Sequence, residues 1–465
     1  MLVPMRTYIG YILIALVLCG GAFLLFFGLG DEPLLDYDEA AYGEIVREGL
    51  SNGEFLSFTF LGEPFLQKPP VQFWRMMISS TIFEDEEFAL RFPSALTGFL
   101  VLVLTMLITY HIARDTYAAA LAGAILVTTA HFADISRQAL FDVPVVFSNM
   151  AALYFFLLAL RNHRWFLLMG AALGISILTK SIFVLFALIA IAAFIVFYKR
   201  SDIFRDAYFW GSIALAALIA LPWHLYEYAR FGSEFIRIYV SYNIFERLGT
   251  DLLGSSPSLY LRYLYDHAAL WSGVFLLAVG AAIGLPRRLR PEIRSAALSC
   301  VAAIAIILVL LSIVQTRIAA YLVSVYPLAA IVIALTISEL LKTTKRTWML
   351  IAGIVLLLIS AFLVTTQWIF SERLHSTPFA LAREGKTIGT YIDGSGFYAY
   401  EYRDLQTIMY YSNSLHPLAL TPESPLPAGT FIVMKTADEE RFRREYPVRL
   451  EAIYFGSLLR LYRVE

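Results

Sequence analysis

Residues 8–30 read YIGYILIALVLCGGAFLLFFGLG, and stretches of this kind decide the fold. A helix that crosses a bilayer needs about 20 mostly apolar residues, because ~30 Å of hydrocarbon is covered at ~1.5 Å per residue. The stretch is longer than the apolar core of a secretory signal, which has roughly 7–15 residues. We therefore interpret it as an uncleaved membrane anchor.

Apolar stretches of similar length recur along the chain of 465 residues. Hydrophobic residues make up 59% of the sequence and charged residues 16%, against about 25% charged residues in an average protein. This composition excludes a soluble globular protein, a disordered chain, collagen and a coiled coil. It predicts an all-α polytopic membrane protein with about eleven transmembrane helices. We place them at residues 8–30, 88–113, 117–133, 143–160, 165–178, 182–198, 208–222, 268–285, 296–314, 319–340 and 348–370.

The charges are balanced in number and sorted in position. With 36 basic and 37 acidic residues the net charge is −1, so the composition excludes a nucleic-acid partner. The loops on one side carry fourteen Lys and Arg residues, whereas the short loops on the other side carry seven. Cytoplasmic loops are the more basic ones. We therefore expect a cytoplasmic N-terminus, and an odd number of spans then places the C-terminus outside.

Two polar segments interrupt the apolar pattern, and both are expected outside. Residues 31–87 hold thirteen acids and three bases, and residues 38–50 have helical apolar spacing, which predicts amphipathic helices on the membrane surface. In residues 371–465, short β runs at 396–400, 430–434 and 458–464 accompany a polar helix at 437–446. We therefore expect a transmembrane domain at 1–370, which includes loop 31–87, and a small extracytoplasmic α/β domain at 371–465.

Several ionisable residues fall at the expected external boundary. Such groups are costly beside a membrane and are functional hypotheses by default. Although they are far apart in sequence, the topology brings them to one face, as in the active site of a helical membrane enzyme. They are Asp36, Asp38, Glu39, Lys68, Arg137, Asp142, Lys180, Arg247 and Arg317.

Each acidic candidate has a structural alternative. The carboxylates at 36–39 could raise one another's pKa and leave one as a proton acceptor, or they could cap the following helix and form its acidic first turn. Asp142 precedes Val143-Pro144 and could be only an N-cap. Both readings of each residue stay open at this point.

The basic candidates also have alternatives. Lys68, held before Pro69-Pro70, could bind a lipid phosphate or only extend to the interface. Arg137 could pair with Asp142 or bind phosphate. Arg247 and Arg317 lie in loops where interfacial anchors are common. His224 has no His partner nearby, which argues against a metal site. No nucleotide-binding or soluble-hydrolase motif is present.

Three strings together resemble a known group of enzymes: DEAAYGE at 38–44, GEPFLQKPP at 62–70 and RFPSA at 91–95. Further matches are Arg137 with DVP at 142–144, LTK at 178–180, LPWH at 221–224, and Arg317 with Tyr321 and Tyr326-Pro327. Over most of residues 1–330 the chain resembles the bacterial aminoarabinose-transferase and protein O-mannosyltransferase superfamily of membrane glycosyltransferases. The resemblance implies the C-type glycosyltransferase fold.

The resemblance also implies a reaction and a site. A sugar would pass, with inversion, from a polyprenyl-phosphate-linked donor to lipid A, another lipid or a glycan, on the outer face of the bacterial inner membrane. Asp38 would be the catalytic carboxylate, with Glu39 beside it and Asp142 as a second catalytic acid. The side chains that would face the donor phosphate are Lys68, Arg137, Arg247, Arg317 and Tyr321.

The chain departs from the superfamily pattern at two positions. Ala41 stands where an Arg is frequent, and Gln67 stands where a Glu is frequent. Because a metal site in some relatives uses that Glu, we expect no cofactor and a metal-independent reaction, with a divalent cation as the alternative. Alternative functions are a protein O-glycosyltransferase, a transporter, which would need an inverted repeat that the sequence lacks, and a non-catalytic envelope-assembly protein. The oligomeric state stays open.

Overall fold

The computed structural model describes residues 5–251, 256, 258–342, 347–401, 405–413, 418–420, 424 and 426–465. The chain forms two compact units. Unit 1 comprises Met1–Phe27, Leu66–Gln72 and Pro93–Ile369. Unit 2 comprises Gly28–Phe65, Phe73–Phe92 and Phe370–Glu465.

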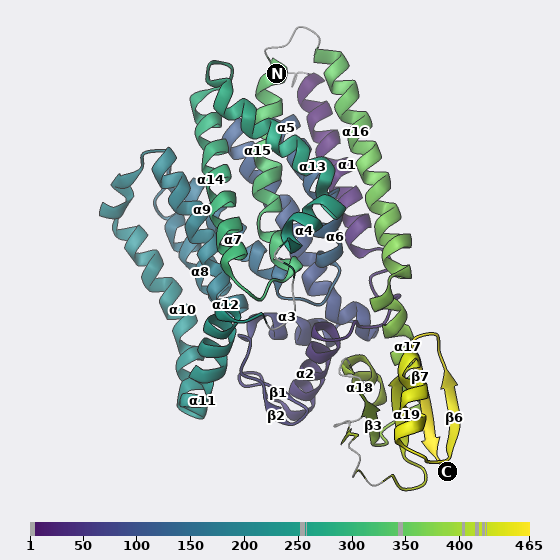
Figure 1. Ribbon diagram of the computed structural model, residues 1–465. Coiled ribbons are helices and arrows are strands. Elements are labelled where there is room, and N and C mark those ends of the chain that lie inside the picture. The colour runs from purple at the N-terminus through teal and green to yellow at the C-terminus, as the bar shows by residue number, and fades with distance from the viewer. Residues whose placement is uncertain are drawn as a thin grey trace. The chain divides into compact units, whose positions relative to one another are not determined.

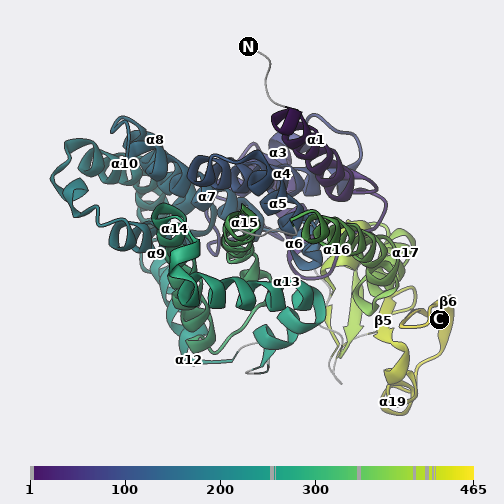
Figure 2. The same ribbon diagram turned by 90° about the horizontal axis from the view of Figure 1, so that it is seen from above.

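Unit 1 is a bundle of apolar helices (Figure 1). Its long helices are α1 (Met5–Phe26), α4 (Glu86–Ala113, shared with unit 2), α5 (Thr116–Val127), α6 (Ala130–Ser136), α7 (Asp142–Ala159), α8 (Trp165–Lys180), α9 (Val184–Phe197), α10 (Ala207–Phe231), α13 (Leu259–Gly284), α14 (Pro291–Ile313), α15 (Tyr326–Lys342) and α16 (Thr347–Gln367). Helix α15 is buried over most of its length and contacts α5, α13 and α14 (Figure 2). A helix that is apolar all round is typical of such a central position.

Short elements connect these helices, and the last two of them lead from α16 into the unit 2 segment of the chain. They are η1 (Ser181–Phe183), η2 (Ser201–Arg205), α11 (Ser233–Phe235), the π-helix η3 (Ile236–Glu246), α12 (Arg247–Gly249), η4 (Pro286–Arg288), η5 (Ala319–Ser324), the π-helix η6 (Trp368–Glu372) and η7 (Arg373–His375). Three of them, η1, η5 and α12, carry residues of the candidate site.

The described helices nearly match the expected spans. Nine are long and apolar enough to cross a membrane, or ten if the bent pair α5 and α6 is one span, against about eleven expected. The difference is the run Trp165–Phe197, in which α8 and α9 are joined by η1 and count as one. The Arg200 guanidinium, just past α9, donates to Leu160 O, just before α8, at 3.4 Å. The two ends of the run therefore lie together, and the run is a helical hairpin.

Unit 2 contains the predicted amphipathic helix and a mixed sheet. Its helices are α2 (Asp38–Asn52), α3 (Val71–Ser80, whose first residues are in unit 1), α17 (Thr377–Ile392), α18 (Gln406–Ser412), η8 (Thr436–Asp438) and α19 (Glu439–Glu445), and a two-stranded ribbon joins β1 (Thr59–Phe60) to β2 (Glu63–Pro64). The prediction of a helix from residue 38 is confirmed. Helix α2 ends at Gly53, whose φ of 67° is the left-handed conformation that glycine adopts without strain.

The small α/β domain expected near the C-terminus is confirmed. Its sheet has the order β4 (Leu418–Ala419), β3 (Phe397–Tyr400), β5 (Phe431–Lys435), β7 (Leu459–Val464), β6 (Leu450–Phe455). Strand β3 pairs in parallel with β4 and β5, whereas β7 is antiparallel to β5 and β6. Two apolar clusters cover the sheet: one includes residues of α17 and α18, and the other includes Phe442 of α19. Strand β6 and helix α17 are additions to the predicted elements.

Candidate active site

The acids at 36–39 lie in three different environments within unit 2. Asp36 is half-buried, and its Oδ1 accepts a hydrogen bond from Thr407 N of α18 at 2.8 Å. Glu39 is 1% exposed and forms an ion pair with Arg91. Asp38, the first residue of α2, is exposed. Asp38 is therefore the one acid of these three that a substrate can reach without a rearrangement.

Arg91 of α4 holds the loop between α1 and α2. Its Nε donates to Glu39 Oε1 at 2.9 Å and its Nη2 to Glu39 Oε2 at 2.8 Å, a bidentate pair. The same guanidinium donates to three carbonyl oxygens of the loop, those of Leu29 (3.1 Å), Glu32 (2.7 Å) and Pro33 (2.7 Å). Glu39 is thus engaged in fixing the loop that leads to Asp38.

The backbone immediately before Asp38 is strained. Tyr37 has φ 67° and ψ −106°, a conformation that side-chain-bearing residues rarely adopt. Such a residue costs about 1–3 kcal/mol and persists only where its surroundings determine it, most often at functional sites. The Tyr37 side chain is 56% exposed, so no burial of its ring compensates this cost. Strained backbone therefore immediately precedes the exposed Asp38.

A second cluster lies in unit 1, where α8 ends. Lys180 Nζ is 2.6 Å from Asp142 Oδ1, and both side chains are less than 10% exposed. Asp142 is the first residue of α7, and Phe141 occupies the N-cap without a side-chain cap. The carboxylate of Asp142 therefore serves the ion pair and not a cap. The Lys180 ammonium also lies over the rings of Phe183, at 4.5 Å, and Tyr321, at 4.6 Å.

Arg247 extends this cluster through Tyr321. Its Nη1 donates to the Tyr321 hydroxyl at 3.2 Å. Burial would lower the pKa of Arg247, but the phenol oxygens of Tyr321 and Tyr242 hold that pKa above its ordinary value. Asp142, Lys180, Tyr321 and Arg247 thus form one connected group of one anion, two cations and a phenol. The sequence named three of them as site residues and placed Lys180 only at the external boundary.

Two of the other predicted cations, Arg137 and Arg317, donate to backbone carbonyls at helix ends. Arg137 Nη1 donates to Leu24 O and Phe27 O, both at 2.9 Å, at the end of α1. Arg317 donates to Ser312 O at 3.3 Å and to Gln315 O at 3.4 Å, at the end of α14. Cations are favourable at helix C-termini, where carbonyl groups lack helical partners. These two arginines therefore close helices at the boundary.

Lys68 lies on a loop that packs in unit 1. Leu66 joins a buried cluster with Leu178, Ala220, Trp223, Phe235 and Tyr239. At the other end of the loop, Gln72 Nε2 donates to Ser94 Oγ at 3.3 Å. Lys68 itself is half-buried. Leu66 and Leu178, each two residues from a lysine, belong to one cluster, so the loop carrying Lys68 is anchored against the end of α8 that carries Lys180.

The described residues offer no cluster of three or more His, Cys, Asp or Glu side chains that could hold a metal ion. His224 is engaged by other groups: its Nε2 lies 2.9 Å from the Tyr239 hydroxyl and its Nδ1 lies 2.8 Å from Ala220 O. Residue 67 is an amide, Gln67. The cations of the connected group in unit 1 are Lys180 and Arg247.

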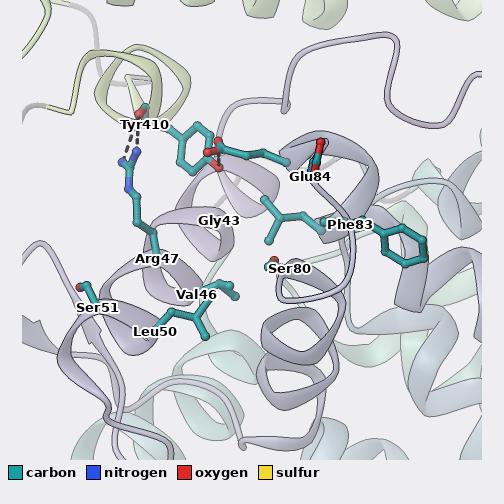
Figure 3. Close-up of a pocket in the computed structure, with 12 residues that line it drawn as sticks. Gly43, Val46, Arg47, Leu50, Ser51, Ser80, Phe83, Glu84 and Tyr410 are labelled. Carbon is teal, nitrogen blue, oxygen red and sulfur yellow. Dashed lines mark hydrogen bonds between the residues drawn. The ribbon is translucent and has the colours of Figure 1, made fainter.

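A hollow of about 490 Å³ opens in unit 2 beside α2 (Figure 3). Arg47 points across it to α18 and donates to Tyr410 O at 3.0 Å and to Asn413 Oδ1 at 2.7 Å. At 100° per residue, Gly43, Arg47 and Leu50 on its wall lie roughly 120–180° around α2 from Asp38. The hollow therefore does not open on the face of Asp38.

Known proteins resemble this chain in sequence and in fold. Residues 29–236 match the family model of dolichyl-phosphate-mannose-protein mannosyltransferases. Over 97% of both chains, the structure superposes on the crystal structure of ArnT from Cupriavidus metallidurans bound to undecaprenyl phosphate, with a TM-score of 0.77 and 16% identity. The chain has the ArnT fold. The Archaeoglobus fulgidus oligosaccharyltransferase is a more distant match, with a TM-score of 0.56, 13% identity and coverage of 95% of this chain and 70% of that one.

Curated relatives match part of the chain. An undecaprenyl phosphate-alpha-4-amino-4-deoxy-L-arabinose arabinosyl transferase of Aeromonas salmonicida is 32% identical over 220 residues, 45% of this chain and 40% of that protein. An uncharacterized protein of Aquifex aeolicus is 29% identical over 236 residues, 49% of this chain and 46% of that protein. The matches thus span less than half the length of these relatives. The resemblance to the aminoarabinose-transferase and mannosyltransferase superfamily is confirmed.

Proposed function

We propose that the chain is an inverting glycosyltransferase that takes a sugar from a polyprenyl-phosphate-linked donor. The observation that carries the proposal is the exposed Asp38 carboxylate next to strained backbone, in a chain that has the ArnT fold and that also holds buried cations in unit 1. A leaving phosphate needs cations and an acceptor needs a base, and the chain supplies both kinds of group.

The reaction is a direct displacement at the anomeric carbon. The acceptor oxygen or nitrogen attacks this carbon, the bond from carbon to phosphate oxygen breaks, and the electron pair leaves with the polyprenyl phosphate. The proton of the acceptor passes to the Asp38 carboxylate. A positioned base contributes roughly 10²–10⁴-fold, and fixed charges at the departing oxygen contribute further stabilisation.

The cations have different roles in this proposal. The charge of Lys180 is matched by Asp142, so this pair positions Tyr321 and its partner Arg247. Lys68 and Arg247 then bind the donor phosphate, with the Tyr321 hydroxyl as an additional donor. Arg137 and Arg317 add positive potential at the boundary from their helix-end positions. With these cations in place we expect a reaction that needs no metal.

For the substrates, the proposal follows the chemistry that the name of the arabinosyl transferase relative states. We propose an undecaprenyl-phosphate-linked sugar as donor and lipid A, or another envelope lipid or glycan, as acceptor. The N-terminus lies in the cytoplasm, the protein spans the bacterial inner membrane, and the C-terminal domain lies outside, in line with the distribution of basic residues. Protein O-glycosylation is the second candidate, supported by the matching family model.

The experiment is reconstitution of the purified full chain in lipid nanodiscs. Undecaprenyl phosphate-α-4-amino-4-deoxy-L-arabinose is supplied with lipid A or with a peptide acceptor, and the products are identified by mass spectrometry. Glycosylated lipid A supports the first candidate, and a glycosylated peptide supports the second. Lipids that co-purify with the chain are identified in parallel, since a sugar-linked polyprenyl phosphate among them names the native donor.

A further inference from the structure

Helix α18 of the C-terminal domain binds the loop that precedes Asp38. Thr407 N donates to Asp36 Oδ1 at 2.8 Å, and Thr407 Oγ1 donates to Leu34 O at 3.1 Å. Leu34 N donates to the Tyr411 hydroxyl at 2.9 Å, and this hydroxyl donates to Glu87 Oε1 at 2.8 Å. The amide and the carbonyl of Leu34 are thus both satisfied by one short helix.

Helix α18 is in turn fixed by the core of its own domain. Ile408 is buried in one cluster with Ile388 and Ile392 of α17. Gly389 of α17 lets α18 approach closely: a Cβ there would lie 2.8 Å from Tyr411 Cβ and 3.0 Å from Ser412 N. Backbone atoms cannot move aside as a flexible side chain does. Helix α18 thus connects the packed core of the sheet domain to the loop at Leu34.

The loop needs such support. Asp36 and Tyr37 immediately precede Asp38, and Tyr37 adopts the strained conformation described above. Arg91 holds the earlier part of the loop, up to Pro33, and Glu39 behind Asp38. Helix α18 holds Leu34 and Asp36, the part in between. Arg91 and α18 together hold the residues on both sides of Asp38, and Asp38 itself stays exposed.

We propose that the C-terminal domain contributes to the catalytic centre. Its helix α18 is a clamp: it holds residues 34–37 in place and thereby presents Asp38 to the substrate. Thr407 and Tyr411 are positioning residues, and Asp36 is the acceptor of the Thr407 amide rather than a second base. The expected effect on turnover rests on the proposed function. The ordering of the loop by α18 does not depend on the substrate.

The test uses the full chain in nanodiscs and the double variant Thr407→Val/Tyr411→Phe, which removes two hydroxyls and keeps the apolar packing. Hydrogen exchange of residues 34–41 should quicken at least tenfold, and turnover of the undecaprenyl-phosphate aminoarabinose donor should fall 10- to 100-fold with the donor KM within about twofold of wild type. The matched control is Tyr462→Phe, which removes a hydroxyl bonded to Glu439 in the other core of the same domain. The control should leave both readouts at wild-type values.

Asp36 gives a second test that separates support from chemistry. Asp36→Asn keeps an oxygen that accepts from Thr407 N, so its turnover should stay within about threefold of wild type. Asp36→Ala removes the acceptor and should behave like the double variant. Wild-type exchange of residues 34–41 in the double variant and in Asp36→Ala would overturn the clamp. Equal loss of turnover in Asp36→Asn and Asp36→Ala would overturn the positioning role of Asp36.

These outcomes are distinguishable from failure of the proposed function. A wild-type chain that turns over none of the offered donors contradicts that function, whereas the exchange readout still decides the clamp. If Asp38→Asn is inactive while Thr407→Val/Tyr411→Phe is fully active, the proposed function is supported and the clamp is contradicted.

Discussion

The carboxylate of Asp142 and the ammonium of Lys180 lie 2.6 Å apart, and both side chains are less than 10% exposed. The pair joins the first residue of α7 to the last residue of α8. It places a compensated charge beside Tyr321, which in turn meets Arg247. The pair therefore supports the proposed phosphate site, and its contribution to the free energy of unfolding can be measured with variants.

Lys180→Met should leave the Asp142 carboxylate buried without its partner. Removing one member of a buried pair costs about 3–5 kcal/mol, so thermal unfolding in nanodiscs should occur at a clearly lower temperature. The double variant Lys180→Met/Asp142→Asn removes both charges and should recover most of this stability. If the double variant were as unstable as the single one, the ion pair would not be the source of the effect.

Lys68→Ala should weaken binding of undecaprenyl phosphate by about 10- to 100-fold, because a charged hydrogen bond contributes about 1.5–3 kcal/mol. The turnover number at saturating donor should fall much less. The measurement is a titration of the nanodisc protein with undecaprenyl phosphate. Lys199→Ala, which removes one exposed lysine from the loop after α9, is the control and should bind as wild type. Unchanged affinity in Lys68→Ala would contradict the phosphate role.

Arg91→Met should destabilise unit 2, because the Glu39 carboxylate would lose its buried partner and three loop carbonyls would lose their donor. The expected loss is again about 3–5 kcal/mol. Glu39→Gln keeps an oxygen acceptor for the guanidinium and should be milder. The check is limited proteolysis together with thermal unfolding. A stable Arg91→Met variant with a protected loop would show that the loop is held by other contacts.

A chelator should not abolish turnover. In the proposed mechanism, lysine and arginine side chains balance the phosphate charge, and residue 67 is Gln rather than Glu. Activity after dialysis against EDTA should remain within about twofold of the untreated protein. Loss of activity with EDTA and its recovery with one divalent cation would refute a metal-independent reaction.

The sequence predicts what depends on local pattern. Apolar length locates the spans, helical spacing locates α2, and alternating runs locate β3, β5 and β7. The separate spans predicted at residues 165–178 and 182–198 correspond to α8 and α9, and the contact of Arg200 with Leu160 O shows that the chain turns back between them.

What sequence reasoning missed depends on pairs far apart in the chain. Asp142 and Lys180 are 38 residues apart, Glu39 and Arg91 are 52, and Asp36 and Thr407 are 371. Local pattern could not separate Asp36, Asp38 and Glu39, which are close neighbours of similar chemistry. Tertiary contacts distinguish them: Asp36 accepts a hydrogen bond from α18, Asp38 is exposed, and Glu39 forms a buried ion pair with Arg91.

The most direct test of the central claim is the turnover of Asp38→Asn in nanodiscs, measured beside its affinity for undecaprenyl phosphate. We expect a fall in sugar transfer of about 10²–10⁴-fold, the contribution of a positioned base, with undecaprenyl phosphate affinity and thermal stability at wild-type values. Transfer at the wild-type rate by a stable Asp38→Asn variant would contradict the role of Asp38 as the catalytic base.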